Sequence, residues 1–278
     1  MIQVEFQGVG KTFQTGNQEI VALDDICLQV RQGEFWTIIG PSGSGKTTLL
    51  RCLAGFEFLT AGKIYVSGHQ VSAPGRDRMM VFQDLDQLFP WRTVLSNVML
   101  ALKLAQPGTT PAERKSLALD YLDLMGLIEY AHFYPYQLSG GMKQRVAIAR
   151  ALGVKPSVLL MDEPFGSLDA ITRSGLQKEL LRIWHETGVT IIFVTHNIEE
   201  ALLLADQIVV LARGGTIRAV VKNVLARPRS TKNASFTTAW QHLHHLLEQS
   251  GYRGQPGTAS RPSLDPRPLA RPLGQATL

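Results

Sequence analysis

The stretch Gly40-Pro41-Ser42-Gly43-Ser44-Gly45-Lys46-Thr47 has the pattern G-x-x-x-x-G-K-T. The residues before it, Phe35 to Ile39, form a short apolar, β-branched run that predicts a strand, and residues 47–54 predict a helix. Gly43 and Gly45 carry no Cβ, so the backbone there can wrap a phosphate with successive N–H groups pointing at it. A glycine-rich turn that merely contains Lys-Thr is the alternative, and the flanking strand and helix argue against it. The order strand, loop, helix therefore predicts a phosphate-binding loop in an α/β fold.

A second segment, Val158 to Glu163, supplies carboxylates that fit this loop. Its continuous apolar run predicts a central parallel strand, and open α/β sheets bind ligands at the carboxyl ends of such strands. Lys46 would neutralise the β- and γ-phosphates of a nucleotide, while the Thr47 hydroxyl and Asp162 would hold Mg²⁺. Glu163 would accept the proton of an attacking water. The alternative is that the two carboxylates only open a turn, and it loses weight beside Lys46 and Thr47.

A third segment, Leu138-Ser139-Gly140-Gly141-Met142, precedes a predicted helix that runs from Met142 to Leu152. A helix N-terminus carries unpaired N–H groups and a partial positive charge, so it attracts anions. The chain therefore predicts two separate anion-binding helix starts. We expect a nucleotide site that is split between them and that a second copy completes.

These segments resemble those of the nucleotide-binding subunit of an ABC transporter, over roughly residues 1–225. Motifs occur in the order of that family: Walker A at Gly40 to Thr47, the Q-loop at Gln83, the signature at Leu138 to Met142, the end of Walker B at Asp162 and Glu163, the D-loop at Ser167-Leu168-Asp169, and the H-loop at His196. The resemblance implies an α/β fold with a P-loop NTPase (RecA-like) core, an antiparallel β-subdomain and a helical subdomain. It also implies ATP and Mg²⁺ as cofactors.

The resemblance assigns roles that the residues alone leave open. It implies that Gln83, at a hinge, offers its amide oxygen to Mg²⁺ or to the attacking water, and that His196 reaches the γ-phosphate. A lone Gln or His at a strand end is otherwise an ordinary polar residue. The signature would bind the γ-phosphate held by a second copy in a head-to-tail dimer, and Asp169 would cross the seam of that dimer.

The expected site is therefore a set of residues drawn from all these motifs. Glu163, His196 and Gln83 are the expected catalytic residues, and Thr47, Gln83 and Asp162 the expected metal ligands. The expected nucleotide-binding residues are Phe13, Gly40, Pro41, Ser42, Gly43, Ser44, Gly45, Lys46, Thr47, Thr48, Ser139, Gly140, Gly141 and Asp169. Phe13 would stack on adenine, with core packing as the alternative. The chain departs from the family at Asn197, where Asp is usual, and at Ser167, where Ala is usual.

Composition narrows the class of protein. The 278 residues lack an apolar run of membrane-spanning length, and the start of the sequence lacks a signal-peptide pattern, so we expect a soluble, cytoplasmic protein. Of the net charge of +5, four arginines against one aspartate place +3 in the last 26 residues, which leaves +2 for the rest of the chain. This charge is a weak argument for a nucleic-acid partner, and none is predicted. Cys27 and Cys52 lie in apolar segments without metal-ligand spacing and are predicted to be reduced core residues.

Periodicity predicts further elements. Val4 to Phe13, Ile20 to Val30 and Lys63 to Val66 predict the antiparallel strands, and residues 84–155 the helical subdomain. Helices are predicted over 113–126, with Leu117, Tyr121, Leu124 and Met125 on one side, and over 173–187. An amphipathic helix is predicted within 226–252, to pack on its own chain or on a second copy, with three solvated histidines (His242, His244 and His245) that are not expected to bind metal. Residues 253–278 predict a disordered tail.

The stretch Gln87 to Val94 bears on the kind of ABC protein. An exposed Phe89 and Trp91 around a proline would suit a groove that receives a helix of a membrane partner, while inward packing of both is the alternative. The sequence around Glu163 and His196 resembles that of the ATP-binding subunits of importers for nitrate, sulfonates and taurine. We therefore expect an importer ATPase with transmembrane permease subunits and, indirectly, a solute-binding protein, at the cytoplasmic face of the inner membrane. The alternatives are a soluble ABC ATPase acting on ribosomes or DNA, and a non-catalytic nucleotide sensor, which would be expected to lack Lys46 or Glu163.

Overall fold

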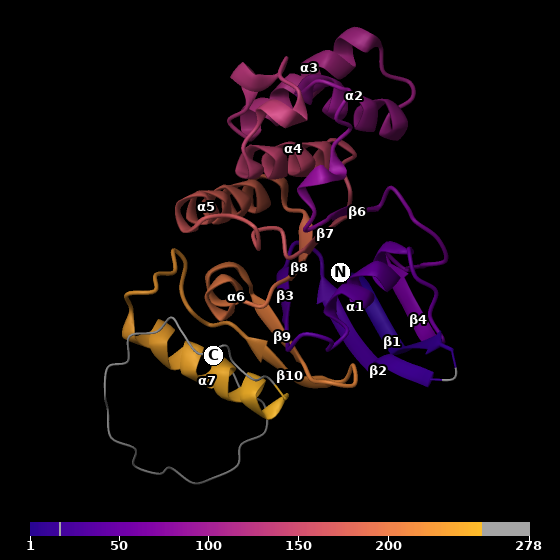
Figure 1. The fold of residues 1–278 in the computed structure, drawn as a ribbon, viewed down its shortest axis with the longest axis vertical. Helices are drawn as coiled ribbons and strands as arrows, with labels where there is room; N and C mark the ends of the chain where they lie inside the picture. The colour runs from indigo at the N-terminus through magenta and orange to yellow at the C-terminus, as the bar shows by residue number, and fades with distance from the viewer. Residues whose placement is uncertain (17, 252–278) are drawn as a thin grey trace.

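The computed structural model describes residues 1–16 and 18–251. A six-stranded sheet in the order β10-β9-β3-β8-β7-β6 forms its centre (Figure 1). These strands are β3 (Phe35–Ile39), β6 (Arg78–Val81), β7 (Val158–Asp162), β8 (Thr190–Val194), β9 (Gln207–Leu211) and β10 (Ile217–Lys222). All neighbours pair in parallel except β10, which is antiparallel to β9. Strands β3, β7 and β8 are buried along their whole length, as continuous apolar runs require.

A second, antiparallel sheet has the order β2-β1-β4-β5. It consists of β1 (Ile2–Thr15), β2 (Gln18–Arg31), β4 (Ala61–Val66) and β5 (His69–Gln70). Apolar residues alternate along these strands, and those on one face, such as Val4, Ile26 and Ile64, are buried against the same cluster as Ile38 of β3. The predicted α/β fold with an antiparallel β-subdomain is thus confirmed.

Helices surround the central sheet and extend beyond one of its edges. They are α1 (Lys46–Ala54), α2 (Val94–Ala105), α3 (Pro111–Leu124), α4 (Gly140–Gly153), α5 (Ala170–Thr187), α6 (Ile198–Leu204) and α7 (Ala234–Gln249), with short 3-10 helices at Leu85–Gln87, Ile128–Tyr130 and Pro135–Gln137. Figure 1 shows α2, α3 and α4 gathered at one end of the molecule, next to β6. The domain limits expected from the sequence stay predictions.

Two helices begin earlier than their apolar periodicity predicts, because a side chain caps each of them. Thr110 and Glu113 form a capping box at the start of α3, and Asp169 accepts hydrogen bonds from the first turn of α5. The predicted apolar side of α3 is correct in part. Met125, at the end of the helix, is buried, and Leu117, Tyr121 and Leu124 are half-buried and pack against the core, but the fully buried residues within the helix are Ala118 and Leu122. The small Ala118 did not register as apolar in the expected pattern.

The C-terminal helix α7 packs on the core of its own chain. Its apolar face carries Phe236, Ala239, Leu243 and Leu247, all buried in the larger core cluster, and the helix lies against α6. Figure 1 shows it alongside α6 and the β9–β10 end of the sheet. Of the two partners left open by the sequence, the structure selects this subunit's own core.

The histidines of α7 do not gather into a metal site. His244 stacks on Trp240, with ring centroids 4.8 Å apart, and His245 Nε2 lies 2.6 Å from Gln249 Nε2. Within residues 1–16 and 18–251, no group of three or more His, Cys, Asp or Glu side chains is placed to hold a metal ion.

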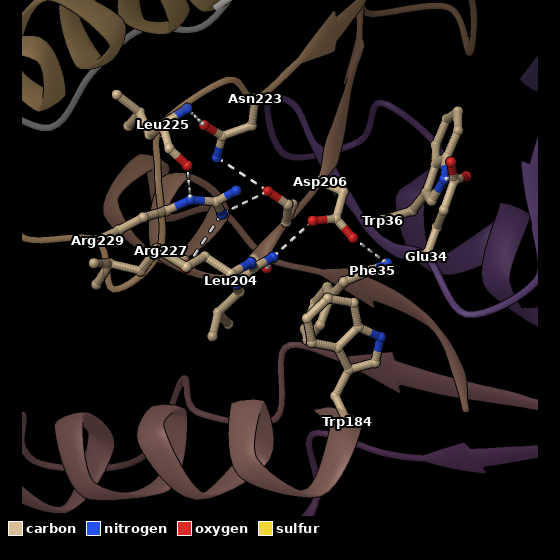
Figure 2. A network of polar contacts seen from close by, with 12 residues as sticks. Glu34, Phe35, Trp36, Trp184, Leu204, Asp206, Asn223, Leu225, Arg227 and Arg229 are labelled. Atoms are coloured by element: carbon tan, nitrogen blue, oxygen red, sulfur yellow. Dashed lines mark hydrogen bonds and ion pairs between the residues drawn. The ribbon is translucent and has the colours of Figure 1, made fainter. Parts of the chain in front are cut away.

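Two arginines tie the segment between β10 and α7 to the C-terminal end of α6 (Figure 2). Arg229 donates from Nη1 to the carbonyl oxygen of Ala205 at 2.6 Å. Arg227 donates from Nη2 to Asp206 Oδ1 at 2.8 Å, and its guanidinium lies 4.7 Å from the centroid of the Trp184 ring. Burial lowers the pKa of Arg229 to about 10. Because the last carbonyls of a helix lack intrahelical partners, these contacts satisfy the end of α6 and fix the approach to α7.

One cysteine prediction was wrong. Cys27 is exposed, because β2 alternates and its neighbours Ile26 and Leu28 take the buried face; its sulfur accepts a hydrogen bond from Gly8 N at 3.2 Å. Cys52 is buried as predicted, and burial raises the pKa of its thiol to about 11. In the part of the chain that the structure describes, no helix has the length and apolar character needed to cross a membrane. The tail predicted for residues 253–278 lies outside the described residues.

Candidate functional site

The predicted phosphate-binding loop lies between β3 and α1, at the carboxyl end of β3. Gly43 and Gly45 have φ angles of 78° and 90°, in the left-handed region that favours glycine. A Cβ on Gly45 would lie 2.2 Å from the carbonyl oxygen of Ala22 in β2, so no side chain fits there. Along this loop Pro41 and Ser44 are buried, while Ser42 and Gly43 are exposed. The glycines therefore shape a turn whose exposed part is free to face a phosphate.

Lys46 and Thr47 begin α1 with their side chains in different surroundings. Lys46 is 7% exposed, and its Nζ donates to the carbonyl oxygens of Gly40 and Pro41, each at 3.0 Å. Burial lowers the pKa of Lys46, and the charges of nearby carboxylates oppose that shift. Thr47 is exposed and donates from Oγ1 to Asp162 Oδ1 at 3.1 Å, which joins the start of α1 to the end of β7. The loop thus holds a cation and a hydroxyl beside a carboxylate.

Glu163 follows the last residue of β7 and turns the chain sharply. Its φ of 42° is unusual for a residue with a side chain, and its N–H donates to the carbonyl oxygen of Val194 at 2.9 Å. His196 Nδ1 lies 2.8 Å from Glu163 Oε2. That hydrogen bond raises the pKa of His196 and lowers the pKa of Glu163. The structure therefore brings together the expected base and the expected γ-phosphate sensor from two neighbouring strands.

The residues expected to hold Mg²⁺ fit that ion in part. Thr47 and Asp162 present adjacent hard oxygens, and burial raises the pKa of Asp162 while its hydrogen bond to Thr47 opposes the shift. Magnesium commonly takes one or two protein oxygens and completes its shell with phosphate oxygens and water. Gln83 is exposed, and both Gln83 and Glu163 lie near Gly166. A Cβ added to Gly166 would be 3.4 Å from Gln83 Nε2 and 3.8 Å from Glu163 Oε2. Gln83 thus lies on the same side of the site as Glu163.

The signature is not brought to this loop within one chain. Ser139 caps α4 and accepts a hydrogen bond from Met142 N at 3.3 Å. A Cβ on Gly141 would lie 2.4 Å from Thr172 Cγ2, so α4 touches the first turn of α5 there. Helix α4 packs against α2, α3, α5 and β6, whereas α1 packs against β2, β6, β7 and β8 (Figure 1). The two helix starts that are predicted to bind anions therefore lie apart within one chain.

Asp169 and Phe13 lie outside the phosphate-binding loop, at the start of α5 and in β1. Asp169 Oδ1 accepts from Ile171 N and Thr172 N, both at 3.0 Å, and hydrogen bonding to Thr172 lowers the pKa of the aspartate. Phe13 is half-buried near the end of β1, opposite Ile20, with Lys11 Nζ 4.6 Å from its ring centroid. It belongs to the β1–β2 hairpin whose Ala22 touches the phosphate loop.

The departure at Asn197 has a structural explanation. Its Oδ1 accepts from Glu199 N at 2.8 Å and Glu200 N at 3.3 Å, so Asn197 caps α6. Asn and Asp are about equally good at this position, and the substitution keeps the cap.

The stretch after Gln83 presents one large aromatic to solvent. Trp91 is 71% exposed, whereas Phe89 is half-buried, 5.6 Å from the Trp91 ring and 5.9 Å from the Arg150 guanidinium. The buried Asn97 holds this loop by accepting from Phe89 N at 2.9 Å and donating to Arg92 O at 3.2 Å. The expected exposed pair is therefore correct for Trp91 and only partly so for Phe89.

Two charged residues beside Glu163 and His196 were missed by sequence reasoning. Arg173 and Glu200 line, with Glu163, His196 and three other residues, a cavity of about 20 Å³. Glu200 is 5% exposed. The signal available in the sequence was a carboxylate on the apolar side of the short helix that follows His196, the predicted γ-phosphate sensor.

Comparison with known proteins bears on what this site is. Residues 23–166 match the family model described as ABC transporter. The nitrate import ATP-binding protein NrtD of Synechococcus elongatus is 49% identical over 81% of this chain and 83% of its own. The bicarbonate transport ATP-binding protein CmpD of a Synechocystis species is 44% identical over 80% of this chain and 79% of its own.

A solved dimeric ATP-binding cassette in a post-hydrolysis state, bound to ADP and Pi, superposes with a TM-score of 0.72 at 35% identity. It covers 80% of this chain and 100% of its own. The family-model match over residues 23–166 includes the phosphate loop, the strand that ends in Asp162, and Glu163. The chain therefore belongs to the ABC transporter family.

Proposed function

We propose that this chain is the ATP-hydrolysing subunit of an ABC importer for a small anionic solute of the nitrate, sulfonate or taurine type. The observation that carries this proposal is the placement of Glu163 and His196, 2.8 Å apart, beside the Lys46 and Thr47–Asp162 cluster. Relatives named for nitrate import and for bicarbonate transport support the class of cargo, since both are small anions.

In this proposal the loop from Gly40 to Thr48 cradles the phosphates of ATP. Lys46 Nζ would leave the two carbonyls that it now contacts and turn to the β- and γ-phosphates. Thr47 and Asp162, with Gln83, would hold Mg²⁺. When bound, that ion would neutralise charge on the β- and γ-phosphates.

Glu163 is the proposed base. As the oxygen of water bonds to the γ-phosphorus, the bond from that phosphorus to the oxygen shared with the β-phosphate breaks, and ADP and phosphate form. Glu163 accepts the proton of the water, and the hydrogen bond from His196 keeps its carboxylate ionised and oriented. His196 is placed to reach the γ-phosphate from its other ring nitrogen.

A second copy completes each site in a head-to-tail dimer. The separation of α4 from α1 within one chain supports this arrangement, because Ser139, Gly140 and Gly141 then face the nucleotide of the partner. Asp169 would lie at the seam between the two copies. The dimeric cassette among the solved structures supports the same assembly.

The remaining parts of the proposal concern the location of the protein in the cell, the contact with adenine and the domain boundaries. We place the chain as a peripheral subunit at the cytoplasmic face of the inner membrane, where Trp91 contacts a transmembrane permease and a solute-binding protein delivers the cargo. Phe13 would stack on adenine. The ATPase domain would span 1–225, with a helical subdomain at about 84–155 and a C-terminal helix within 226–252.

The alternatives from the sequence gain no support. The named relatives are import and transport subunits, which argues against a soluble ATPase of ribosomes or DNA. Lys46 and Glu163 are both present, and they lie close enough for the charge of Glu163 to act on Lys46. The presence of both residues argues against a non-catalytic sensor.

Capture from membranes tests this function. Tagged Glu163→Gln protein, which we expect to bind ATP without hydrolysing it, is incubated with ATP and solubilised membranes of its host, and bound proteins are identified by mass spectrometry. A multi-helix permease and a solute-binding protein are the expected partners, and Trp91→Ala in the same background should reduce their recovery without reducing ATP binding. Recovery of ribosomal or DNA-repair proteins would overturn the proposal.

A further inference from the structure

A buried carboxylate, Glu200, joins the elements that follow the D-loop and the H-loop. It lies in α6, is 5% exposed, and accepts a hydrogen bond at Oε2 from Thr195 Oγ1 at 2.5 Å. Its other oxygen, Oε1, faces α5, where Gln177 Nε2 lies at 3.4 Å and Arg173 Nε at 3.8 Å. Burial raises the pKa of Glu200, and the hydrogen bond from Thr195 and the charge of Arg173 oppose that shift.

On the side of the H-loop, these contacts fix both neighbours of His196. Thr195 donates to Glu200 and accepts at the same hydroxyl from Asn197 N at 3.1 Å. Its own N–H donates to the carbonyl oxygen of Ile38, at the end of the strand that leads into the phosphate loop. His196 is therefore held between two residues whose positions depend on one hydroxyl, and that hydroxyl is bound to Glu200.

On the side of the D-loop, Arg173 completes the connection. It donates from Nη2 to the carbonyl oxygen of Leu168 at 2.9 Å, directly before Asp169. Asp169 in turn caps the helix that carries Arg173. The Ser167–Asp169 loop and the Arg173 side chain are therefore joined directly by hydrogen bonds.

We propose that Glu200 is a positioning residue for ATP hydrolysis, which links the Ser167–Asp169 loop through Arg173 to the Thr195 hydroxyl and so sets the position of His196 against Glu163. The inference rests on the proposed function. It adds that the loop at the dimer seam and the histidine of the same chain's site are joined by a direct chain of polar contacts.

Energetics favour a role for this charge beyond packing. Burying a carboxylate is costly unless it is well paired, and an apolar residue of similar volume often packs a helix interface at least as stably. Arg173 contacts Glu200 at 3.8 Å without a hydrogen bond from Nε, so the pairing is incomplete. The buried Glu200 carboxylate therefore acts by fixing the positions of the Thr195 hydroxyl and the Arg173 side chain.

The experiment compares steady-state ATP hydrolysis by the full chain and by single variants. Glu200→Gln should lower kcat by about tenfold and change KM for ATP by less than about twofold, since it removes a charge-assisted contact and leaves the phosphate loop intact. Glu199→Gln is the matched control, because Glu199 is the exposed neighbour on the same helix, and it should hydrolyse ATP at the normal rate.

A second pair of variants addresses folding. Thr195→Val has nearly the same shape but lacks the hydroxyl, and it should lower kcat as Glu200→Gln does. Thr195→Ser keeps the hydroxyl and should restore the rate. Thermal unfolding shows whether each variant is folded at the assay temperature.

The proposal is overturned if folded Glu200→Gln and Thr195→Val keep a normal kcat, or if Thr195→Ser is as slow as Thr195→Val. Failure of the proposed function looks different. Without ATPase activity the unmodified chain would not hydrolyse ATP at all, and a role outside import would appear in the proteins captured with Glu163→Gln and not in these rates.

Discussion

Replacing Gly141 by alanine tests how closely the signature helix packs on α5. The new Cβ would lie 2.4 Å from Thr172 Cγ2 and 3.8 Å from Leu176 Cδ1, whereas carbon atoms in contact prefer about 3.5–4.0 Å. Helix α4 must therefore shift from α5, or Thr172 must move. Overpacking of this kind costs about 1–3 kcal/mol, and removal of a helical glycine returns at most about 1 kcal/mol. We expect a net loss of about 1–2 kcal/mol of unfolding free energy.

Thermal unfolding measures this loss. For a chain of this size, about 1–2 kcal/mol corresponds to a fall in Tm of about 2–8 °C. Gly175→Ala is the matched control: it lies in α5 with nothing within 4 Å of the added Cβ, so Tm should stay the same or rise. Because Ser139 starts the same helix as Gly141, we also expect Gly141→Ala to lower the ATPase rate.

A second substitution separates steric overlap from other causes. Thr172→Ser removes the Cγ2 methyl and keeps the hydroxyl, so in combination with Gly141→Ala it should recover most of the lost Tm. A fall in Tm that Thr172→Ser leaves unchanged, or an equal fall for Gly175→Ala, would refute the packing argument.

Lys46→Ala should weaken ATP binding by about 10³-fold in calorimetry, because an ion pair at about 4 Å and an effective dielectric constant of about 20 contributes about 4 kcal/mol; unchanged affinity would contradict the role of the phosphate loop. Leu243→Ala should lower the unfolding free energy by about 2–5 kcal/mol since Leu243 is 0% exposed, whereas the exposed Gln241→Ala should change it by less than about 0.5 kcal/mol; equal effects would mean that α7 does not pack on its own core. The Glu163–His196 hydrogen bond lowers the pKa of the first and raises the pKa of the second. Its stabilisation is therefore present between those two pKa values, is lost as pH rises through the pKa of folded His196 and is lost as pH falls through that of folded Glu163. The His196 side chain is 59% exposed, so the effect is at most about 1 kcal/mol; Tm of the nucleotide-free protein should fall from about pH 6 to about pH 8 more than that of His196→Gln, and parallel profiles would show that the pair contributes nothing.

The features predicted from the sequence are those that short local patterns specify. The phosphate loop follows from glycine spacing between an apolar strand and a helix, and the structure shows Gly45 where no side chain fits. The central, parallel position of β7 follows from its continuous apolar run, and the structure pairs it in parallel with β6 and β8. These patterns depend on neighbours within a few residues, so no knowledge of tertiary contacts is needed.

The features that escaped prediction depend on contacts between distant residues. Arg173 and Glu200 meet because α5 and α6 pack together, and their separation in the sequence does not predict this contact. The buried face of α3 is centred on Ala118, whose small side chain carries little hydrophobic signal. Cys27 was misplaced because an apolar segment was treated as buried throughout, although alternation along β2 turns every second residue outward.

The most direct test of the split site is the mass of Glu163→Gln in solution with and without ATP, by size-exclusion chromatography with light scattering. We predict a monomer without nucleotide and twice that mass with ATP and Mg²⁺. Ser139→Arg in the same background should prevent the change by blocking the helix start that we propose faces the partner's nucleotide. Full ATP binding by Glu163→Gln without any increase in mass would contradict the conclusion that a second copy completes the site.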